Sequence, residues 1–271
     1  MIKIKVDVCL ITHNSEKFLN RVLYNIKEVI PYRRIVLVDG ESKDGTLKIA
    51  EKHGCEIIKS VANMGRQRTI AYQTMETEWF YSSDDDIILP KNYWQMVSLY
   101  IKRDDVGLID CYLNNIYLTD FALTREPLFK FRGRKVHIRF RRYGFLGCAL
   151  IRKKAVHNFN WDQPRRDGRI ASELIRSNGY KLLQLPFFSK HYDDKTWEDV
   201  LEVHAYSSLY ISNLLKLKRV IGVLVYGLKC PWLYHHCIKL AYIMLKGHFG
   251  AGKYLKSKNF NKLRKMKEQL N

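Results

Sequence analysis

The sequence predicts an α/β fold in which helices cover both faces of a mostly parallel β-sheet. Short apolar runs that are typical of buried strands alternate with segments whose apolar residues recur at helical spacing. Hydrophobic residues make up 46% of the 271 residues, which is enough for a sizeable core. In such a sheet, ligands bind beyond the carboxyl ends of the strands, so polar residues at those ends are the candidates for function.

Strands and helices alternate regularly in the first part of the chain. Thr12 to Ser15 forms a turn and N-cap that lead into the first helix, and Pro31 ends that helix because proline cannot continue it. Gly54 supplies a C-cap for the second helix. We expect strands at 6–11, 35–38, 55–59, 79–83 and 106–111, and helices at 18–30, 46–54, 66–77 and 92–102.

The pattern changes after the fifth strand. Residues 125–142 are irregular and carry eight Lys or Arg side chains. We interpret this basic segment either as part of an acceptor site that meets a phosphate or as a solvated loop. Beyond it we expect a short strand after Cys148 and a helix near Lys153, then a loop at 161–169, a helix at 170–178 and a strand at 181–185.

Charge and cysteine content limit the class of protein. The formal net charge of +20 requires an anionic partner, such as nucleic acid, an anionic lipid surface or a phosphorylated substrate. The six cysteines show no paired C-x-x-C spacing and are expected to be reduced, buried thiols. The N-terminus enters a strand almost at once, without the pattern of a signal peptide. These features favour a cytoplasmic protein.

Three successive carboxylates, Asp84, Asp85 and Asp86, follow the strand at 79–83. Adjacent like charges repel by about 4 kcal/mol where the effective dielectric constant is near 20, so a cation is expected among them. All-oxygen ligands suit Mg²⁺ or Mn²⁺, which are usually held by one or two carboxylates together with substrate phosphates. The alternative is a solvated acidic turn. Asn14 and Asp39 also follow strands, so one crevice can collect all of these groups.

The ordered set of motifs resembles the family 2 glycosyltransferases, which have the GT-A fold, a Rossmann-like mostly parallel sheet. The resemblance covers roughly residues 5–192. It implies transfer of a sugar from a nucleotide diphosphate sugar, linked to UDP or GDP, normally with inversion and with a divalent cation. The matching segments are VCLITHN at 8–14, IVLVDGESKDGT at 35–46, NMGRQR at 63–68, SSDDDIILP at 82–90, YGFLGCALIRKKA at 143–155 and DGRIASELIRSNGYKLLQLP at 167–186.

The resemblance also implies roles for individual residues near the nucleotide. Thr12 and Asn14 are expected to border it, and Asp39 to accept a hydrogen bond from the base. Asp44 is expected to cap the helix that follows it rather than to contact ligand. For the diphosphate, the resemblance suggests Arg66 and Arg68, although each can equally lie on a solvated helix face.

In the Asp triplet, the resemblance places the D-x-D motif at Asp84 and Asp86. Asp86 is then expected to bind the metal directly. Asp84 is expected to contact the ribose or a metal-bound water. Asp85 either contacts the sugar or contacts no ligand. His191 is a further candidate metal ligand, and its imidazole suits Mn²⁺ better than Mg²⁺.

An inverting transfer needs a general base, and here the family pattern is incomplete. Counting back from Gly179 places Asp167 in the first acidic position of the motif and Gly168 in the second. Asp167 is the preferred base because it is expected in a loop, and Glu173, within the helix, is the alternative.

The character of the chain changes near residue 195, so we expect a catalytic domain at 1–195 and a helical, basic extension at 196–271. Residues 211–271 hold thirteen Lys or Arg and one Glu. The apolar run 220–228 is too short for a hydrocarbon core, which needs about 20 residues. From 233 onwards an apolar stripe of Cys237, Leu240, Ala241 and Met244 predicts a helix that lies on a membrane surface. Packing of this helix on the catalytic domain explains the stripe equally well.

These features favour a peripheral protein on the cytoplasmic face of a membrane, acting on a lipid-linked or glycan acceptor. Two other classes compete with this interpretation. A sugar-phosphate nucleotidyltransferase has a similar sheet, but it usually carries a glycine-rich loop after the first strand, where this chain has Thr12-His13-Asn14. A nucleic-acid-binding protein would use the positive charge, but no helix-turn-helix, zinc or RNP pattern is present and the Asp triplet opposes it, so no nucleic-acid partner is expected.

Overall fold

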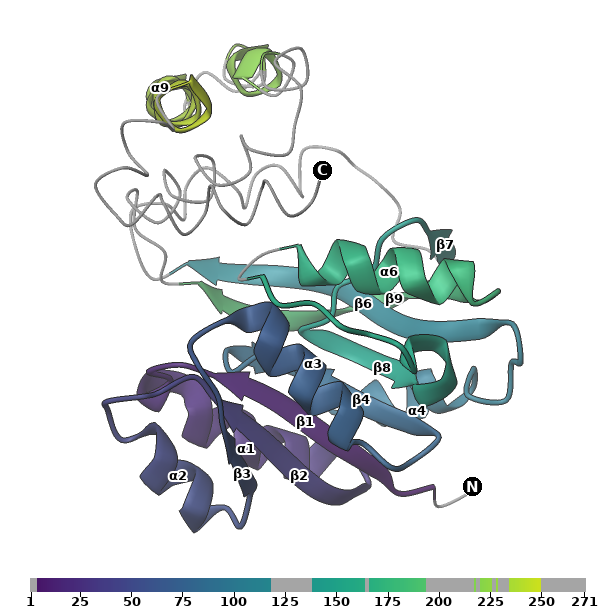
Figure 1. Ribbon diagram of the computed structural model, residues 1–271. Helices are drawn as coiled ribbons and strands as arrows, with labels where there is room; N and C mark the ends of the chain where they lie inside the picture. The colour runs from purple at the N-terminus through teal and green to yellow at the C-terminus, as the bar shows by residue number, and fades with distance from the viewer. Residues whose placement is uncertain are drawn as a thin grey trace. The chain divides into compact units, whose positions relative to one another are not determined.

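The computed structural model describes residues 4–117, 138–163, 166–193, 217, 220–225, 228 and 234–249 (Figure 1). The chain divides into two compact units. The first contains residues 1–114 and 135–192, and the second contains residues 115–134 and 193–271. Most of the predicted basic segment at 125–142 and much of the C-terminal extension lie outside the described residues.

A single mixed sheet forms the centre of the first unit and confirms the α/β fold class. In the described part of the chain it has nine strands in the order β3-β2-β1-β4-β8-β6-β9-β5, with β7 paired to β9. Strands β1 to β4 pair in parallel, whereas β8 pairs antiparallel with β4 and β6, and β9 pairs antiparallel with β5 and β7. The strands are β1 Val6–Thr12, β2 Tyr32–Asp39, β3 Glu56–Lys59, β4 Trp79–Ser83, β5 Ile87–Ile88, β6 Val106–Tyr117, β7 Arg139–Arg141, β8 Cys148–Arg152 and β9 Lys181–Asp193.

Helices cover both faces of this sheet and enclose two apolar clusters. Helices α1, α2 and α4 contribute to one cluster, and α3 and α6 contribute to the other. A 3-10 turn, Lys153–Val156, stands where a helix was expected near Lys153. The helices of this unit are α1 Glu16–Val29, α2 Thr46–Lys52, α3 Met64–Thr74, α4 Tyr93–Ser98 and α6 Asp167–Ser177.

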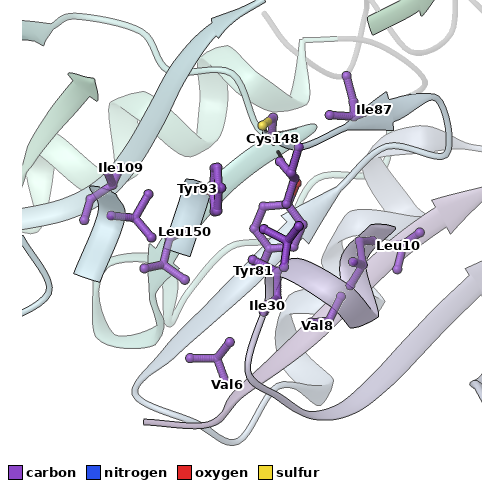
Figure 2. Close-up of a cluster of buried hydrophobic side chains, with 14 of the residues drawn as sticks. Val6, Val8, Leu10, Ile30, Tyr81, Ile87, Tyr93, Ile109, Cys148 and Leu150 are labelled. Carbon is purple, nitrogen blue, oxygen red and sulfur yellow. Dashed lines mark hydrogen bonds between the residues drawn. The ribbon is translucent and has the colours of Figure 1, made fainter. Parts of the chain in front are cut away.

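The alternation of side chains along β1 explains why both faces are covered. Val6, Val8 and Leu10 belong to the cluster beneath α1, where Figure 2 shows them among buried side chains that include Tyr81. Cys9, between them, belongs to the opposite cluster. A strand that is apolar on both faces is typical of a parallel sheet buried between two layers of helices.

The helix ends follow the local rules predicted from the sequence. Helix α1 ends at Val29, two residues before Pro31. Gly54 and Gly179 have φ of 63° and 84°, which places both in the left-handed region that glycine adopts without strain after a helix. Asp44 accepts a hydrogen bond from the Thr46 backbone at 3.0 Å, at the start of α2.

Two boundaries differ from the prediction in ways that affect the site. Helix α6 begins at Asp167, so this residue lies in the first helical turn and not in a loop. Strand β9 continues through Pro186 to Asp193, so His191 lies inside a strand. Proline is tolerated there because residues 182–184 pair with β7 and residues 190–191 pair with β5, and Pro186 lies between the two paired segments.

In the second unit, helix α9 spans Tyr234–Phe249, and residues 220–225 are also helical. Val220 packs with Ala241 and Met244, so Cys237, Ala241 and Met244 of the apolar stripe identified from the sequence are buried and Leu240 is partly buried. This stripe therefore packs within the unit, and binding of the extension to a membrane stays a prediction. None of the described helices is long and apolar enough to cross a membrane.

Buried Gln67 joins the ends of the two central strands. Its Nε2 donates to the carbonyl of Thr12 at 2.8 Å and to the carbonyl of Val38 at 2.9 Å. Because Gln67 lies in α3, one amide fixes a helix against the carboxyl ends of β1 and β2. These are the strand ends that carry Thr12 and Asp39.

We expect Gln67→Met to lower the free energy of unfolding by about 1–3 kcal/mol, because buried carbonyls lose a donor. Urea denaturation measures the change. Gln73 is exposed on the same helix, so Gln73→Met is the matched control and is expected to stay within about 0.5 kcal/mol of the wild type. Equal effects of the two substitutions would contradict the structural role of Gln67.

Candidate active site

The carboxyl ends of β1 and β2 are joined through the carboxylate of Asp39. Thr12 Oγ1 donates to Asp39 Oδ1 at 3.0 Å, and the Ser42 backbone donates to Asp39 Oδ2 at 2.9 Å. The Ser42 hydroxyl donates to Oδ1 at 2.6 Å. Asp39 is 1% exposed, so these bonds hold a buried carboxylate at the edge of the sheet. Of the residues predicted to border a nucleotide, Thr12 and Asp39 are therefore in direct contact.

Asn14 lies in the neighbouring turn, with a left-handed φ of 52°. Its side-chain oxygen accepts from the Lys43 backbone at 2.8 Å, and its own backbone N–H donates to Ser42 Oγ at 2.8 Å. The turns after β1 and β2 are thus held together by side chains, and Asn14 itself is exposed.

Asp84 is enclosed between a guanidinium and a glycine. Arg68 Nη2 donates to Asp84 Oδ1, and the Asp84 backbone donates to the Gly147 carbonyl at 2.9 Å. A Cβ on Gly147 would clash with the Asp84 carboxylate and would lie 2.8 Å from the Phe145 ring. Gly147 therefore leaves the space that the Asp84 side chain fills.

Asp85 points back toward the turn after β1, where it accepts a hydrogen bond from Ser15 Oγ. Ser15 occupies the N-cap position of α1, but its side chain makes no capping bond and binds Asp85 instead. Burial, and then the negative charges of Asp86 and Asp84, raise the pKa of Asp85 to about 7, against the effect of the Ser15 hydrogen bond. Burial is the largest cause of this shift, and the neighbouring carboxylates add to it.

Asp86 lies beside His191 because the short strand β5 pairs with β9. Ile87 is opposite His191 in this pairing, and the Tyr192 backbone donates to the Asp86 carbonyl at 3.0 Å. His191 Nε2 is 3.1 Å from Asp86 Oδ2. The structure thus brings together two residues that are 105 positions apart in the chain.

Arg68 connects the Asp triplet to Asp167. Its Nε donates to Asp167 Oδ2, its Nη2 to Asp84, and its Nη1 to Ser82 Oγ at 3.2 Å. The Arg68 side chain is 3% exposed. Burial alone would lower the pKa of the guanidinium, but the charges of Asp84 and Asp167 outweigh it and raise that pKa. Arg68 is therefore a buried link between two carboxylates and lies on no solvated helix face.

Glu173 and Arg66 lie apart from this group. Glu173 forms an ion pair of 2.8 Å with Arg169 on the surface of α6, and this contact lowers the pKa of Glu173. Arg66 is 54% exposed in the first turn of α3 and lies 3.6 Å from Asp162.

Four residues of this site were not identified from the sequence: Ser15, Ser42, Gln67 and Gly147. Ser15, Ser42 and Gln67 each form a hydrogen bond with a predicted residue, and Gly147 leaves room for the side chain of Asp84. Ser42 and Gly147 lie inside the matching motifs, so position in a motif was the available signal for them. Gln67 also lies inside a matching motif, NMGRQR at 63–68, but its burial was not expected because a polar residue on a helix is usually exposed.

The donor atoms at Asp86 and His191 fit a divalent cation of the Mn²⁺ type. A carboxylate oxygen and an imidazole nitrogen are suitable ligands, and the nearby carboxylate of Asp84 supplies further negative charge. Within the described residues, no group of three or more His, Cys, Asp or Glu side chains is arranged to hold a metal. The arrangement fits a cation that takes one or two protein ligands and completes its coordination with substrate phosphates.

Comparisons with solved structures agree with the fold. GalNAc-T7 with UDP, GalNAc and Mn²⁺ matches with a TM-score of 0.57 and 15% identity, over 70% of this chain and 44% of that protein. S. aureus TarS with UDP-GlcNAc matches with a TM-score of 0.54 and 15% identity, over 91% of this chain and 73% of the other.

Glucosyl-3-phosphoglycerate synthase from Mycobacterium tuberculosis, with Mn²⁺, UDP and glucosyl-3-phosphoglycerate, matches with a TM-score of 0.52 and 12% identity. The match covers 73% of this chain and 75% of the synthase. A comparison of the sequence with curated proteins gave no match.

The family comparison identifies the class of enzyme. The family described as "Glycosyl transferase family 2" matches residues 7–159, which is more than half of the chain and includes the turns after β1 and β2 and the Asp triplet. This match favours a glycosyltransferase over a nucleotidyltransferase or a nucleic-acid-binding protein. The chain belongs to glycosyl transferase family 2 and is a glycosyltransferase.

Proposed function

We propose that this glycosyltransferase moves a sugar from a UDP- or GDP-linked donor to a lipid-linked or glycan acceptor, with inversion and with a divalent cation. The observation that carries the proposal is the link through Arg68, which places Asp167 next to Asp84. A candidate base and the first residue of the D-x-D motif thus contact the same guanidinium. The similarity to proteins solved with UDP or UDP-GlcNAc favours UDP over GDP.

The nucleotide is expected at the ends of β1 and β2. Asp39 is held in place by Thr12 and Ser42, and a carboxylate has further lone pairs with which to accept an N–H of the base. Asn14 is exposed at the border of this position. Arg66 is exposed enough to contact the diphosphate, whereas Arg68 is already committed to two carboxylates. We therefore assign phosphate binding to Arg66 and a positioning role to Arg68.

The residues that would hold the cation are Asp86 and His191, with Asp84 in contact with the ribose or a water of the cation. When bound, a divalent cation neutralises negative charge on the diphosphate leaving group. Asp85 is fixed by Ser15 and contributes negative charge to the cluster. The strand pair β5–β9 keeps His191 beside Asp86, so the two side chains are pre-organised.

Asp167 is the proposed general base. Arg68 donates to its Oδ2, which leaves Oδ1 to take the proton of the acceptor hydroxyl. The hydroxyl oxygen then bonds to the anomeric carbon while the bond from that carbon to the diphosphate oxygen breaks. Attack opposite the leaving group inverts the configuration. Glu173 is the weaker candidate because it lies on the helix surface, apart from Asp84 and Asp86.

The acceptor and the location follow from charge. Residues 211–271 carry twelve more positive than negative groups, and each Lys or Arg near an anionic leaflet contributes about 1 kcal/mol. We therefore assign catalysis to residues 1–195 and binding to the cytoplasmic face of a membrane to residues 196–271. An enzyme held at that surface meets lipid-linked acceptors directly.

Replacing Asp86 tests the cation site. Asp86→Asn is expected to weaken UDP binding in the presence of Mn²⁺ by about 10- to 100-fold, because a ligand of the cation is lost. Titration calorimetry with and without Mn²⁺ measures the effect. Exposed Asp104 provides the control variant Asp104→Asn, which is expected to bind as the wild type does. Unchanged Mn²⁺-dependent affinity in Asp86→Asn would refute the assignment.

Gly147→Ala tests the space beside Asp84. The added methyl group is expected to displace the Asp84 carboxylate and to weaken Mn²⁺-dependent UDP binding by about tenfold or more. Gly168→Ala is the control, since a Cβ there meets its nearest neighbour at 3.6 Å, an ordinary contact. If both variants bind UDP as the wild type does, while circular dichroism shows both folded, the packing of Asp84 against Gly147 has no role in binding.

Replacing Asp167 tests the proposed general base. Asp167→Asn is expected to lower the rate of nucleoside diphosphate release by about 10²-fold or more, with little change in UDP affinity. Glu173→Gln is the matched carboxylate-to-amide control and is expected to retain the rate. A large loss in Glu173→Gln together with normal turnover in Asp167→Asn would reverse the assignment. Thermal denaturation of Asp167→Asn shows whether Arg68 still packs.

A further inference from the structure

Exposed apolar side chains are concentrated in the second unit. Nine of the fifteen large hydrophobic side chains that are exposed in the described part of the chain lie between residues 217 and 249. An exposed apolar surface of this density marks an interaction site in a folded protein. The nine side chains are Leu217, Ile221, Leu224, Val225, Leu228, Ile238, Tyr242, Leu245 and Phe249.

Helix α9 carries apolar side chains on two neighbouring faces. Cys237, Ala241 and Met244 are buried, with exposed fractions of 2%, 3% and 5%. About 100° around the helix from these residues, Ile238, Tyr242, Leu245 and Phe249 follow one another at spacings of four, three and four residues, which places them in one row along the helix. This exposed row is not needed to pack α9 against residues 220–225.

The preceding segment presents a second row of the same kind. Residues 220–225 are helical, as are Leu217 and Leu228. Leu217, Ile221, Leu224 and Leu228 have the same four, three, four spacing, and Leu228 is 68% exposed. Val220 lies about 70° around this segment from that row and packs with Ala241. Two helical segments that contact each other through their inner sides thus both expose an apolar row.

Positive charge lies beside the row on α9. Lys239 and Lys246 each follow a residue of the row by one position, which is about 100° around the helix, and they are two turns apart. Both are exposed. Lysine at the edge of an apolar face can keep its ammonium group in water or near anionic headgroups while its methylene stem contacts apolar material.

We propose that these two exposed rows form the surface that docks the protein on an anionic lipid bilayer. The proposal makes the membrane-binding part of the proposed function specific, because it assigns binding to the row from Ile238 to Phe249 and not to the buried stripe. Helix α9 has 16 residues and is about 24 Å long, shorter than a hydrocarbon core of about 30 Å. It is therefore expected to lie in the interface plane, with the apolar row toward the acyl chains.

The experiment uses the full-length protein and flotation with vesicles. One vesicle preparation is phosphatidylcholine, and the other contains about one third phosphatidylglycerol, which supplies the negative charge of an anionic leaflet. Leu228→Glu and Leu245→Glu each place a charge in one row. Leu99→Glu is the matched control, because Leu99 is 70% exposed in the first unit against 68% for Leu228.

We expect Leu228→Glu and Leu245→Glu each to lower the fraction bound to the anionic vesicles by about tenfold or more. In the docked protein, each substitution would replace a leucine that is buried in the bilayer with a charge. Leu99→Glu is expected to change it by less than about twofold. The double variant Lys239→Gln, Lys246→Gln is expected to lose the preference for anionic vesicles but to keep the weaker binding to phosphatidylcholine.

Wild-type flotation of Leu228→Glu and Leu245→Glu would overturn the proposal. A change from dimer to monomer in these variants, measured by light scattering without vesicles, would show that a second copy of the chain covers the rows and would also overturn it. Binding of UDP with Mn²⁺ is measured on the same samples. If the wild type does not bind UDP in the presence of Mn²⁺, the proposed catalytic function is refuted and the docking surface still stands.

Discussion

The buried guanidinium of Arg68 is the interaction on which the site depends. It contacts Asp84 after β4 and Asp167 at the start of α6, so one side chain from α3 joins three elements of the first unit. A buried charge is stable only when it is paired, and removing one partner of such a pair typically costs about 3–5 kcal/mol. Arg68 therefore constrains both carboxylates to one place, and it leaves the group with net negative charge.

That negative charge stands out in a chain of net charge +20. Asp85 and Asp86 add to the carboxylates around Arg68, and burial together with these neighbouring charges raises the pKa of Asp85. In the proposed function, a divalent cation would offset this negative charge, and basic groups such as Arg66 would favour the anionic diphosphate donor.

The sequence predicted the layers of the fold well because buried strands and amphipathic helices leave strong periodic signals. Strand ends followed by Asp39 and Asp84 were located for the same reason. The errors lie where tertiary contacts override local signals. Asp167 joins α6 and contacts buried Arg68, although the preceding polar residues indicated a loop. His191 lies in β9 because that strand changes partners on either side of Pro186, which no local pattern reveals.

Helix α9 shows why periodicity alone did not assign a face. The buried stripe and the exposed row are both apolar, so an amphipathic pattern can be drawn through either of them. Small side chains occur on the packed face, beside the larger Met244. Ala241 and Cys237 are small and allow close approach of the neighbouring segment, whereas Tyr242, Leu245 and Phe249 are large and stand outside the packed side. Small residues permit helices to pack closely, and large apolar residues outside such a contact require another partner. The packed face of α9 therefore builds the unit, and the exposed row is the face that we propose to meet a membrane.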